Sequence, residues 1–231
     1  MKNFQHSSLS VVFILVFCFG SCDSKLTGSK LIQKSIEYHD PKGQWQELNR
    51  VFYFADSRPG KPSRQYTVQI DLPGNYFKYI NSGENLVYEV DGENCIGSEK
   101  GSKDCERAMM LRNYYGYLWG LPMKLKDKGT EIDREYKVED LNGIEAFVVR
   151  VPYEKDIWYF YLHPETYALL AYKFYKDEEK KIGEIIYLKE EVIVGEMKIP
   201  AERSWYRTEN DEFLGTDFLL KTEEPLRKTQ D

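Results

Sequence analysis

The chain has 231 residues and carries 32 Lys and Arg against 38 Asp and Glu, a formal net charge of −6 at pH 7. This acidic balance argues against a nucleic-acid partner, because phosphates are bound by clustered Lys and Arg. The length allows one large β-rich domain or two small ones, but the middle of the chain has no Pro/Gly/Ser linker and no internal repeat. We therefore expect one monomeric domain over residues 29–225.

An almost unbroken apolar run, Leu9–Phe19, lies near the start of the sequence, and the only charge before it is Lys2. The run is about half of the roughly 20 residues that a membrane-spanning helix needs. Its length and flanks match the apolar region of a secretory signal peptide. A buried strand or helix of the folded domain is the alternative. We predict that residues 1–21 are a signal peptide.

Two small residues, Gly20 and Ser21, stand directly before Cys22. The sequence "FGSC" resembles the lipobox of bacterial lipoproteins, although Phe19 replaces the usual Leu. The resemblance implies that Cys22 receives a diacylglyceryl group and becomes the first residue after cleavage; an ordinary signal peptide cut nearby is the alternative. Two or more acyl chains hold a protein stably at a membrane. We therefore expect residues 22–28 to be a lipidated tether with no segment that spans the bilayer.

Cys18 lies in the predicted signal peptide and Cys22 would carry the lipid. Two cysteines, Cys95 and Cys105, therefore remain for the folded domain. Disulfides persist in exported proteins, and the polar segment "IGSEKGSKD" between these cysteines is typical of a surface loop. Closing this loop would stabilise the fold by roughly 3 kcal/mol in the chain-entropy model. A metal pair is the alternative, but this spacing is not typical of ligands and no His is nearby. We predict a disulfide and no metal site.

The first predicted element after the tether is a short amphipathic helix over Ser29–His39. Its apolar residues Leu31, Ile32 and Ile36 share one face. Ser29 can cap its start, and Pro41 follows its end.

Strand patterns follow this helix. In "RQYTVQIDL", Tyr66, Val68 and Ile70 alternate with polar residues, which predicts one buried and one solvated face. Turn residues such as Asp91–Gly92 separate the segments. Similar segments resume from about residue 143 at roughly ten-residue spacing, which favours an antiparallel sheet over βαβ units.

One helix interrupts the strands, over residues 103–119. Ser102 can cap it, and "GLP" at 120–122 ends it. Its strongly apolar face consists of residues at helical spacing: Ala108, Leu111, Tyr115, Leu118 and Trp119.

The segment "IWYFYL", residues 157–162, is apolar on both faces. Alternate residues should be polar in an antiparallel sheet with one solvated side, so something must cover each face. A helix could cover one face, and a second layer or a bound apolar molecule the other. The alternative is that the tyrosine-rich segments fill an ordinary core and expose hydroxyls at its rim.

These features together resemble the lipoprotein-localisation fold of the LolA/LolB type. The sequences "YHDPKGQW", "YYGYLWGLPMKLKD", "YFYLHPETYALLAY" and "MKIPAERSWY" look like an uncharacterised family of exported Gram-negative lipoproteins, over about residues 25–225. The resemblance implies a mainly β (α+β) fold, a curved, half-open antiparallel β-barrel with one or two helices covering or plugging its concave face. It also implies an apolar interior that holds a lipid chain.

The sequence therefore predicts a lipid-anchored binding protein outside the cytoplasm, at the outer membrane and facing the periplasm or the cell surface. Its ligand would be hydrophobic or amphipathic, a lipid or lipoprotein acyl chain, and it would need no cofactor. The alternative is an interaction, structural or stress-sensing module of the cell envelope with a closed core. The predicted ligand-cleft residues lie on the second helix, just after it and on two strands: Met109, Leu111, Tyr115, Leu118, Trp119, Met123, Trp158, Phe160 and Tyr172.

Candidates for catalysis are few. His39 adjoins Asp40 and His163 is close to Glu165, but sequence neighbours rarely face one another, and neither pair has a metal-ligand spacing. The chain has no G-x-S-x-G elbow, no glycine-rich phosphate loop and no C-x-x-C motif. We predict no catalytic residue. A hydrolase, the third class, would need a cleft with a His or carboxylate pair of shifted pKa.

Overall fold

The computed structural model describes residues 25–225, so the predicted signal peptide and Cys22 lie outside the described part. Within it the fold is mainly β, one curved antiparallel sheet with two α-helices. The helices are α1 (Gly28–His39) and α2 (Lys103–Leu118). The strands are β1 (Asn49–Arg58), β2 (Lys61–Asp71), β3 (Tyr76–Asn81), β4 (Leu86–Asp91), β5 (Asn94–Ile96), β6 (Tyr136–Leu141), β7 (Ile144–Pro152), β8 (Ile157–Leu162), β9 (Leu169–Asp177), β10 (Ile182–Val194), β11 (Met197–Arg207) and β12 (Phe213–Glu223).

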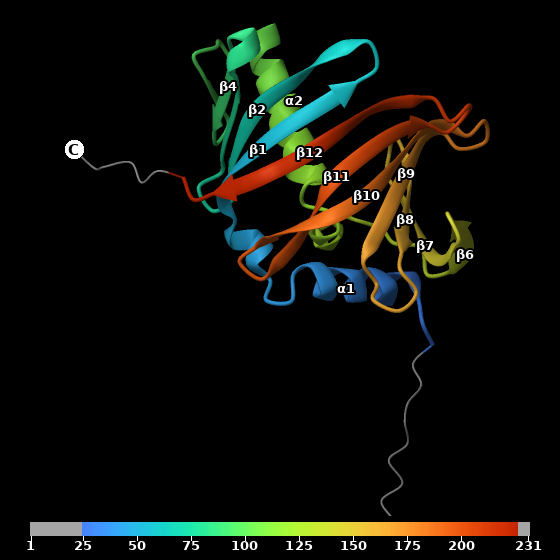
Figure 1. Ribbon diagram of the computed structural model, residues 1–231. Coiled ribbons are helices and arrows are strands. Elements are labelled where there is room, and N and C mark those ends of the chain that lie inside the picture. Colours follow the sequence, from blue (N-terminus) through green and yellow to red (C-terminus); the bar gives the residue numbers. More distant parts are fainter. Residues whose placement is uncertain (1–24, 226–231) are drawn as a thin grey trace, which may run out of the picture.

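The sheet consists of two meanders that meet at β1 and β12. The strand order is β5-β4-β3-β2-β1-β12-β11-β10-β9-β8-β7-β6, so β5 and β6 are its two edges and the described sheet does not close. The chain crosses from one edge to the other through α2, which runs behind β1 and β12 in Figure 1. The other helix, α1, lies across the lower end of the sheet in the same view. The predicted half-open barrel with helices on its concave face is confirmed.

Both helices begin at a side-chain cap. The hydroxyl of Ser102 accepts a hydrogen bond from the backbone N–H of Cys105, as predicted. Helix α1 begins one residue earlier than predicted, at Gly28, and its cap is Thr27 rather than Ser29. The backbone N–H of Gly28 donates to the carbonyl of Arg134 at 2.9 Å, which fixes the first turn beside the β6 side of the sheet.

Helix α2 packs one face against the first meander. Ala108, Leu111, Tyr115 and Leu118 are all buried in the main core. The Tyr115 ring lies within 5.7–6.2 Å, between centroids, of four rings on β1, β2 and β3: Phe54, Tyr66, Phe77 and Tyr79. This half of the concave face is therefore filled by the protein's own side chains.

The two apolar faces of β8 have separate explanations. Phe160 and Leu162 face the main core, whereas Tyr161 belongs to a small cluster on the convex face with Ala146 and Ala171. The ammonium of Lys173 lies 5.1–5.3 Å from the centroids of the Tyr159, Tyr161 and Tyr175 rings on that side. Tyrosines thus cover the convex face here, and the hydroxyls of Tyr159 and Tyr161 donate to the carboxylates of Glu178 and Glu139.

One strand, β6, is absent from the sequence-based prediction, whereas the predicted hairpin turn at Asp91–Gly92 joins β4 to β5. Strand β5 has only three residues. Half of the six residues of β6, "YKVEDL", are charged, as is common in an edge strand. No helix within residues 25–225 is long and apolar enough to cross a membrane.

Candidate ligand-binding site

The predicted ligand-cleft residues fall into two groups. Met109 and Trp158 are partly buried, and Met109 lines a shallow surface depression with Met110. The others are buried in the main core, with 7% exposure or less: Leu111, Tyr115, Leu118, Trp119, Met123, Phe160 and Tyr172. A ligand could reach these buried residues only if the core opened.

A second face of α2 points toward the other meander and is less tightly packed. Tyr114 and Tyr117 lie one helical turn apart on it, and Met110 lies one turn before Tyr114. The Tyr117 ring meets the Trp158 ring edge-on at 5.4 Å between centroids. The Tyr114 ring lies nearly parallel to that of Trp205, with centroids 6.3 Å apart. Tyr114 keeps 37% of its surface exposed and Met110 41%, so solvent reaches this side of the helix.

A cleft of about 320 Å³ opens where Tyr114 approaches β11. We call it the Trp205 cleft. It combines charged and aromatic side chains from five elements, α2, β1, β2, β10 and β11, with the start of β12. Its lining residues are Asp56, Arg58, Arg64, Tyr114, Glu184, Trp205, Leu214, Gly215, Thr216 and Asp217.

One carboxylate of the Trp205 cleft, Asp56, is already paired with two arginines. It accepts hydrogen bonds from the Arg64 backbone N–H at 3.0 Å and from the Arg64 Nε at 2.9 Å, and the Arg58 Nε lies 3.4 Å away. Burial opposes ionisation of Asp56, but the bonds from Arg64 outweigh it, so the pKa of this carboxyl is lowered. Asp56 is therefore ionised and committed to the two arginines.

The second carboxylate, Asp217, is not committed in this way. It lies opposite Asp56 across the β1–β12 pair, and its Oδ2 accepts a hydrogen bond from the Trp205 Nε1 at 3.1 Å. Burial raises its pKa to about 6, although the Trp205 hydrogen bond and nearby Arg203 both favour the ionised form. Burial likewise raises the pKa of Glu184.

A buried cation lies beneath the Trp205 cleft. Arg203 is 1% exposed, and its guanidinium carbon lies 3.4 Å from the centroid of the Trp119 ring. It donates to the carbonyls of Pro200 at 2.6 Å and Leu118 at 3.3 Å. The ring face and the two carbonyls compensate much of its charge.

An apolar strip adjoins the Trp205 cleft on the sheet. Phe174 pairs with Glu184 across β9 and β10, and Trp158 pairs with Phe174 across β8 and β9. The Trp158 and Phe174 rings stack at 5.0 Å between centroids. The side chains of Trp158, Phe174 and Glu184 are all half-buried. The two aromatic rings and the carboxylate of the cleft are therefore neighbours on one face of the sheet.

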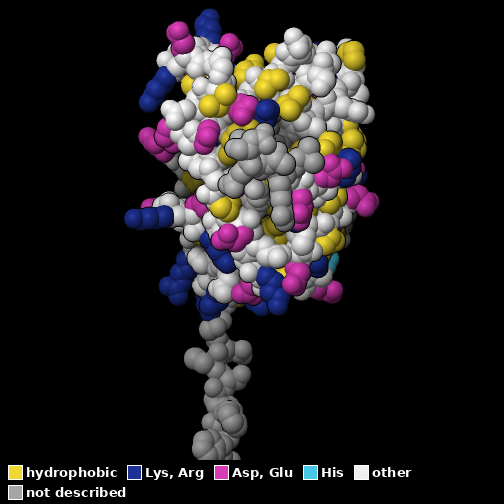
Figure 2. Space-filling model, turned by 90° about the vertical axis from the view of Figure 1, so that its left-hand side faces the viewer, with side chains coloured by type: hydrophobic (Ala, Val, Ile, Leu, Met, Phe, Trp, Pro, Cys, Tyr) yellow, Lys and Arg dark blue, Asp and Glu magenta, His cyan; other side chains and the backbone are white. Residues whose placement is uncertain are grey.

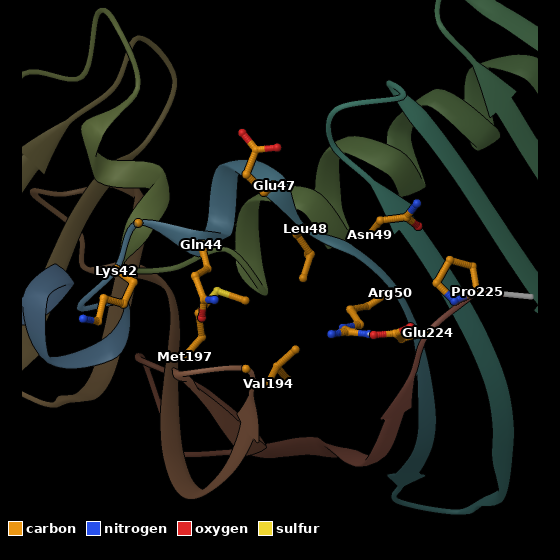
Figure 3. Close-up of a pocket in the computed structure, with 12 residues that line it drawn as sticks. Lys42, Gln44, Glu47, Leu48, Asn49, Arg50, Val194, Met197, Glu224 and Pro225 are labelled. Atoms are coloured by element: carbon orange, nitrogen blue, oxygen red, sulfur yellow. The ribbon is translucent and has the colours of Figure 1, made fainter. Parts of the chain in front are cut away.

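A different pocket lies at the other ends of β1, β10, β11 and β12 from the Trp205 cleft, and Figure 3 shows it. It has a volume of about 480 Å³ and is lined by the segment 42–48, the start of β1, the turn between β10 and β11, and residues 224–225 after β12. Arg50 and Glu224 point toward one another across it, and Arg50 Nη1 lies 2.8 Å from Glu224 Oε1. Because these charges neutralise each other, this pocket is a weaker candidate than the Trp205 cleft.

The charged residues of the Trp205 cleft are absent from the sequence-based prediction, although the strands carry a signal for them. Asp56 is in phase with the core residues Phe52 and Phe54 on β1. Asp217 is in phase with the core residue Leu219, and Arg203 with Ala201. A charge in the buried phase of a strand indicates a paired group or a functional one.

The Trp205 cleft contains one feature that a hydrolase would need, two carboxyls of raised pKa, Asp217 and Glu184. His39 and His163 do not line it. Among residues 25–225, no group of three or more His, Cys, Asp or Glu could hold a metal ion. The structure joins Cys95 to Cys105 by a disulfide, with Cα atoms 5.5 Å apart. The cleft presents aromatic faces and carboxylate oxygens.

The sequence matches the model of one protein family. Residues 9–222 match a family model described as "Family of unknown function (DUF6503)". The chain belongs to this family. No curated protein matches the DUF6503 chain in sequence.

Solved structures share the fold of this DUF6503 protein at low sequence identity. A LolA superfamily protein from Nitrosomonas europaea is 7% identical, with a TM-score of 0.53 over 87% of this chain and 95% of that chain. An outer membrane lipoprotein-sorting protein domain from Vibrio parahaemolyticus is 11% identical, with a TM-score of 0.50 over 83% of this chain and 92% of that chain. The predicted LolA-like fold is thereby confirmed.

Proposed function

We propose that this DUF6503 protein is a lipid-anchored protein outside the cytoplasm that binds an amphipathic ligand without covalent chemistry. One observation carries the proposal: α2 fills only the half of the concave face next to β1–β4. On the other half, the rings of Trp158, Phe174 and Trp205 stay half-buried. Half-buried aromatic rings on a concave face are typical of a ligand site. The lipoprotein-sorting domain from Vibrio with the same fold is consistent with this function.

Binding to a neutral amphiphile tests the proposal. Decyl maltoside below its critical micelle concentration should bind the purified protein with a measurable heat in isothermal titration calorimetry. Trp158→Ala should weaken binding about tenfold, because a buried aromatic contact of this size contributes about 1.5 kcal/mol or more. The matched control is Tyr159→Ala. Tyr159 is the next residue on β8, also half-buried, but its side chain is on the convex face. Equal loss in both variants, or no binding to the parent protein, would contradict the proposal.

The anchor is tested separately, because residue 22 lies outside the described part of the chain. Intact-mass measurement of the protein purified from membranes should show a diacylglyceryl group on Cys22. The Cys22→Ser variant should lack it and leave the membrane fraction, because the acyl chains supply the membrane affinity. An unmodified Cys22 in the parent would refute the anchor.

A second candidate function is supported by the surface of β4 and β5. Leu86, Val87 and Ile96 are 36%, 58% and 50% exposed, and Figure 2 shows hydrophobic side chains gathered in the upper half of the face that carries these elements. Exposed apolar patches mark protein interfaces. This candidate, an interaction module with a closed core, requires that no amphiphile binds, so the calorimetric experiment decides between the two.

A further inference from the structure

We propose that the Trp205 cleft binds a cationic group, an amine or quaternary ammonium, at the polar end of the amphipathic ligand. The inference rests on the proposed function and specifies which ligands the site would select. Four features of the cleft support it: two carboxylates without ion pairs, two aromatic rings, arginines that are already occupied, and an adjoining apolar strip.

The first feature is the pair of carboxylates. Asp217 and Glu184 both line the Trp205 cleft, and within residues 25–225 neither is in an ion pair. The charged groups around Asp217 come from three strands: Asp56 on β1, Arg64 on β2 and Arg203 on β11. Arg64 is bound to Asp56. Arg203 donates to two backbone carbonyls. An entering cation would therefore find an unpaired acceptor in Asp217.

The second feature is the aromatic wall. Trp205 and Tyr114 flank Asp217, and the Trp205 indole is fixed by its hydrogen bond to that carboxylate. A cation near the face of Trp or Tyr is attracted to the ring, and the attraction grows when water is excluded. Aromatic rings beside carboxylates recognise ammonium groups, particularly those whose methyl groups prevent strong hydration.

The third feature excludes an anionic ligand. Arg58 and Arg64 are the two cations that line the Trp205 cleft, and both lie against Asp56. A phosphate or sulfate would compete with Asp56 for these arginines and would share the cleft with Asp217 and Glu184. Like charges repel one another more strongly in a partly buried site than in water, so these carboxylates disfavour an anionic ligand.

The fourth feature places the apolar part of the ligand. Glu184 is next to Phe174 in the sheet, and Phe174 is next to Trp158. A ligand with its cationic end between Asp217 and Glu184 could lay an alkyl chain along these two rings. Head and chain would then be recognised by adjacent parts of one surface.

The experiment compares three amphiphiles that share a decyl chain: decyltrimethylammonium, decyl maltoside and decyl sulfate. Each is titrated into the purified protein below its critical micelle concentration. We expect the cationic amphiphile to bind at least about tenfold more tightly than the neutral one, and the anionic one most weakly, because one partly buried charge pair is worth more than 1.4 kcal/mol. Asp217→Asn should remove most of this preference, because it removes the negative charge and keeps the shape of the side chain. Asn can still accept the Trp205 hydrogen bond, and Glu184→Gln provides a second, independent variant.

The control is Glu131→Gln, which removes one carboxylate at an exposed position outside the Trp205 cleft and should leave all three affinities unchanged. Affinity for the cation should also fall about tenfold from pH 7 to pH 5, because the pKa of Asp217 is about 6 and the protonated acid carries no charge. Equal binding of the cationic and neutral amphiphiles would overturn this inference and leave the proposed function standing. Absence of binding by all three would overturn the proposed function itself.

Discussion

His39 shows how a single buried side chain joins three elements. It lies at the end of α1 with 1% exposure. Its Nε2 accepts a hydrogen bond from the Leu169 N–H of β9 at 2.9 Å, so the proton is on Nδ1, which donates to the Lys198 carbonyl of β11 at 2.6 Å. Both ring nitrogens are therefore used in a structural role. Burial lowers the pKa of His39 to about 4, outweighing the hydrogen bond to Lys198.

His39 should make stability depend on pH in a defined window. Between pH 6.5 and 4 the unfolded chain binds a proton at this position and the folded protein does not, so stability is complete above pH 6.5 and is lost as pH falls toward 4. The loss should be roughly 2–3 kcal/mol. Urea unfolding of the parent and of His39→Gln measures it. Because glutamine does not titrate, the variant should lack this part of the slope; an identical slope in both proteins would contradict the assignment.

At the scale of the element, α2 separates a filled half of the concave face from a partly open one. Its sequence contains two sets of residues, the buried face that includes Leu111 and Tyr115 and the less buried face that includes Tyr114 and Tyr117. Helical periodicity predicted the first set correctly, because a continuous apolar stripe is its normal signal. The second set could not be predicted as a separate surface, since tyrosine suits both a core and a cleft.

Two glycines near the end of α2 should respond oppositely to alanine. An added Cβ at Gly116 would meet nothing within 4 Å, so Gly116→Ala should stabilise by about 0.5–1 kcal/mol through reduced chain entropy. At Gly120 the Trp45 ring occupies the position of the Cβ, and the Gly116 carbonyl oxygen would be 2.6 Å away. Gly120→Ala should destabilise by about 1–3 kcal/mol through overpacking. Thermal unfolding of both variants tests this, and a shift in the same direction would refute it.

At the scale of the whole molecule, the pairing of β1 with β12 unites the two meanders. Ser57 of β1 is opposite Thr216 of β12, more than 150 residues later in the chain. The same pairing brings Asp56 beside Asp217, so the seam of the sheet is also part of the Trp205 cleft. Contacts at this sequence separation form late and are expensive in chain entropy.

Gly215 should be essential at this seam. Its φ is +149°, and an added Cβ would lie 2.7 Å from the Ser57 carbonyl oxygen and 3.1 Å from the Arg58 Cγ. Gly215→Ala should therefore push β12 from β1, lowering the free energy of unfolding by about 1–3 kcal/mol. Gly83→Ala is the control, because its nearest atom would be 3.5 Å away; the change there should stay within about 0.5 kcal/mol. Urea denaturation measures both, and a neutral Gly215→Ala would contradict the role of the seam.

The sequence by itself determined the local structure. Alternating apolar residues defined most of the strands, and Ser102 with helical spacing defined α2, because these signals depend on neighbours within a few residues. It also supplied the resemblance to the LolA/LolB type. Only the tertiary structure decided which rings fill the core and which stay half-open. It also brought Asp56, Arg203 and Asp217 together, because that depends on which distant strands pair and on the side of the sheet that α2 covers.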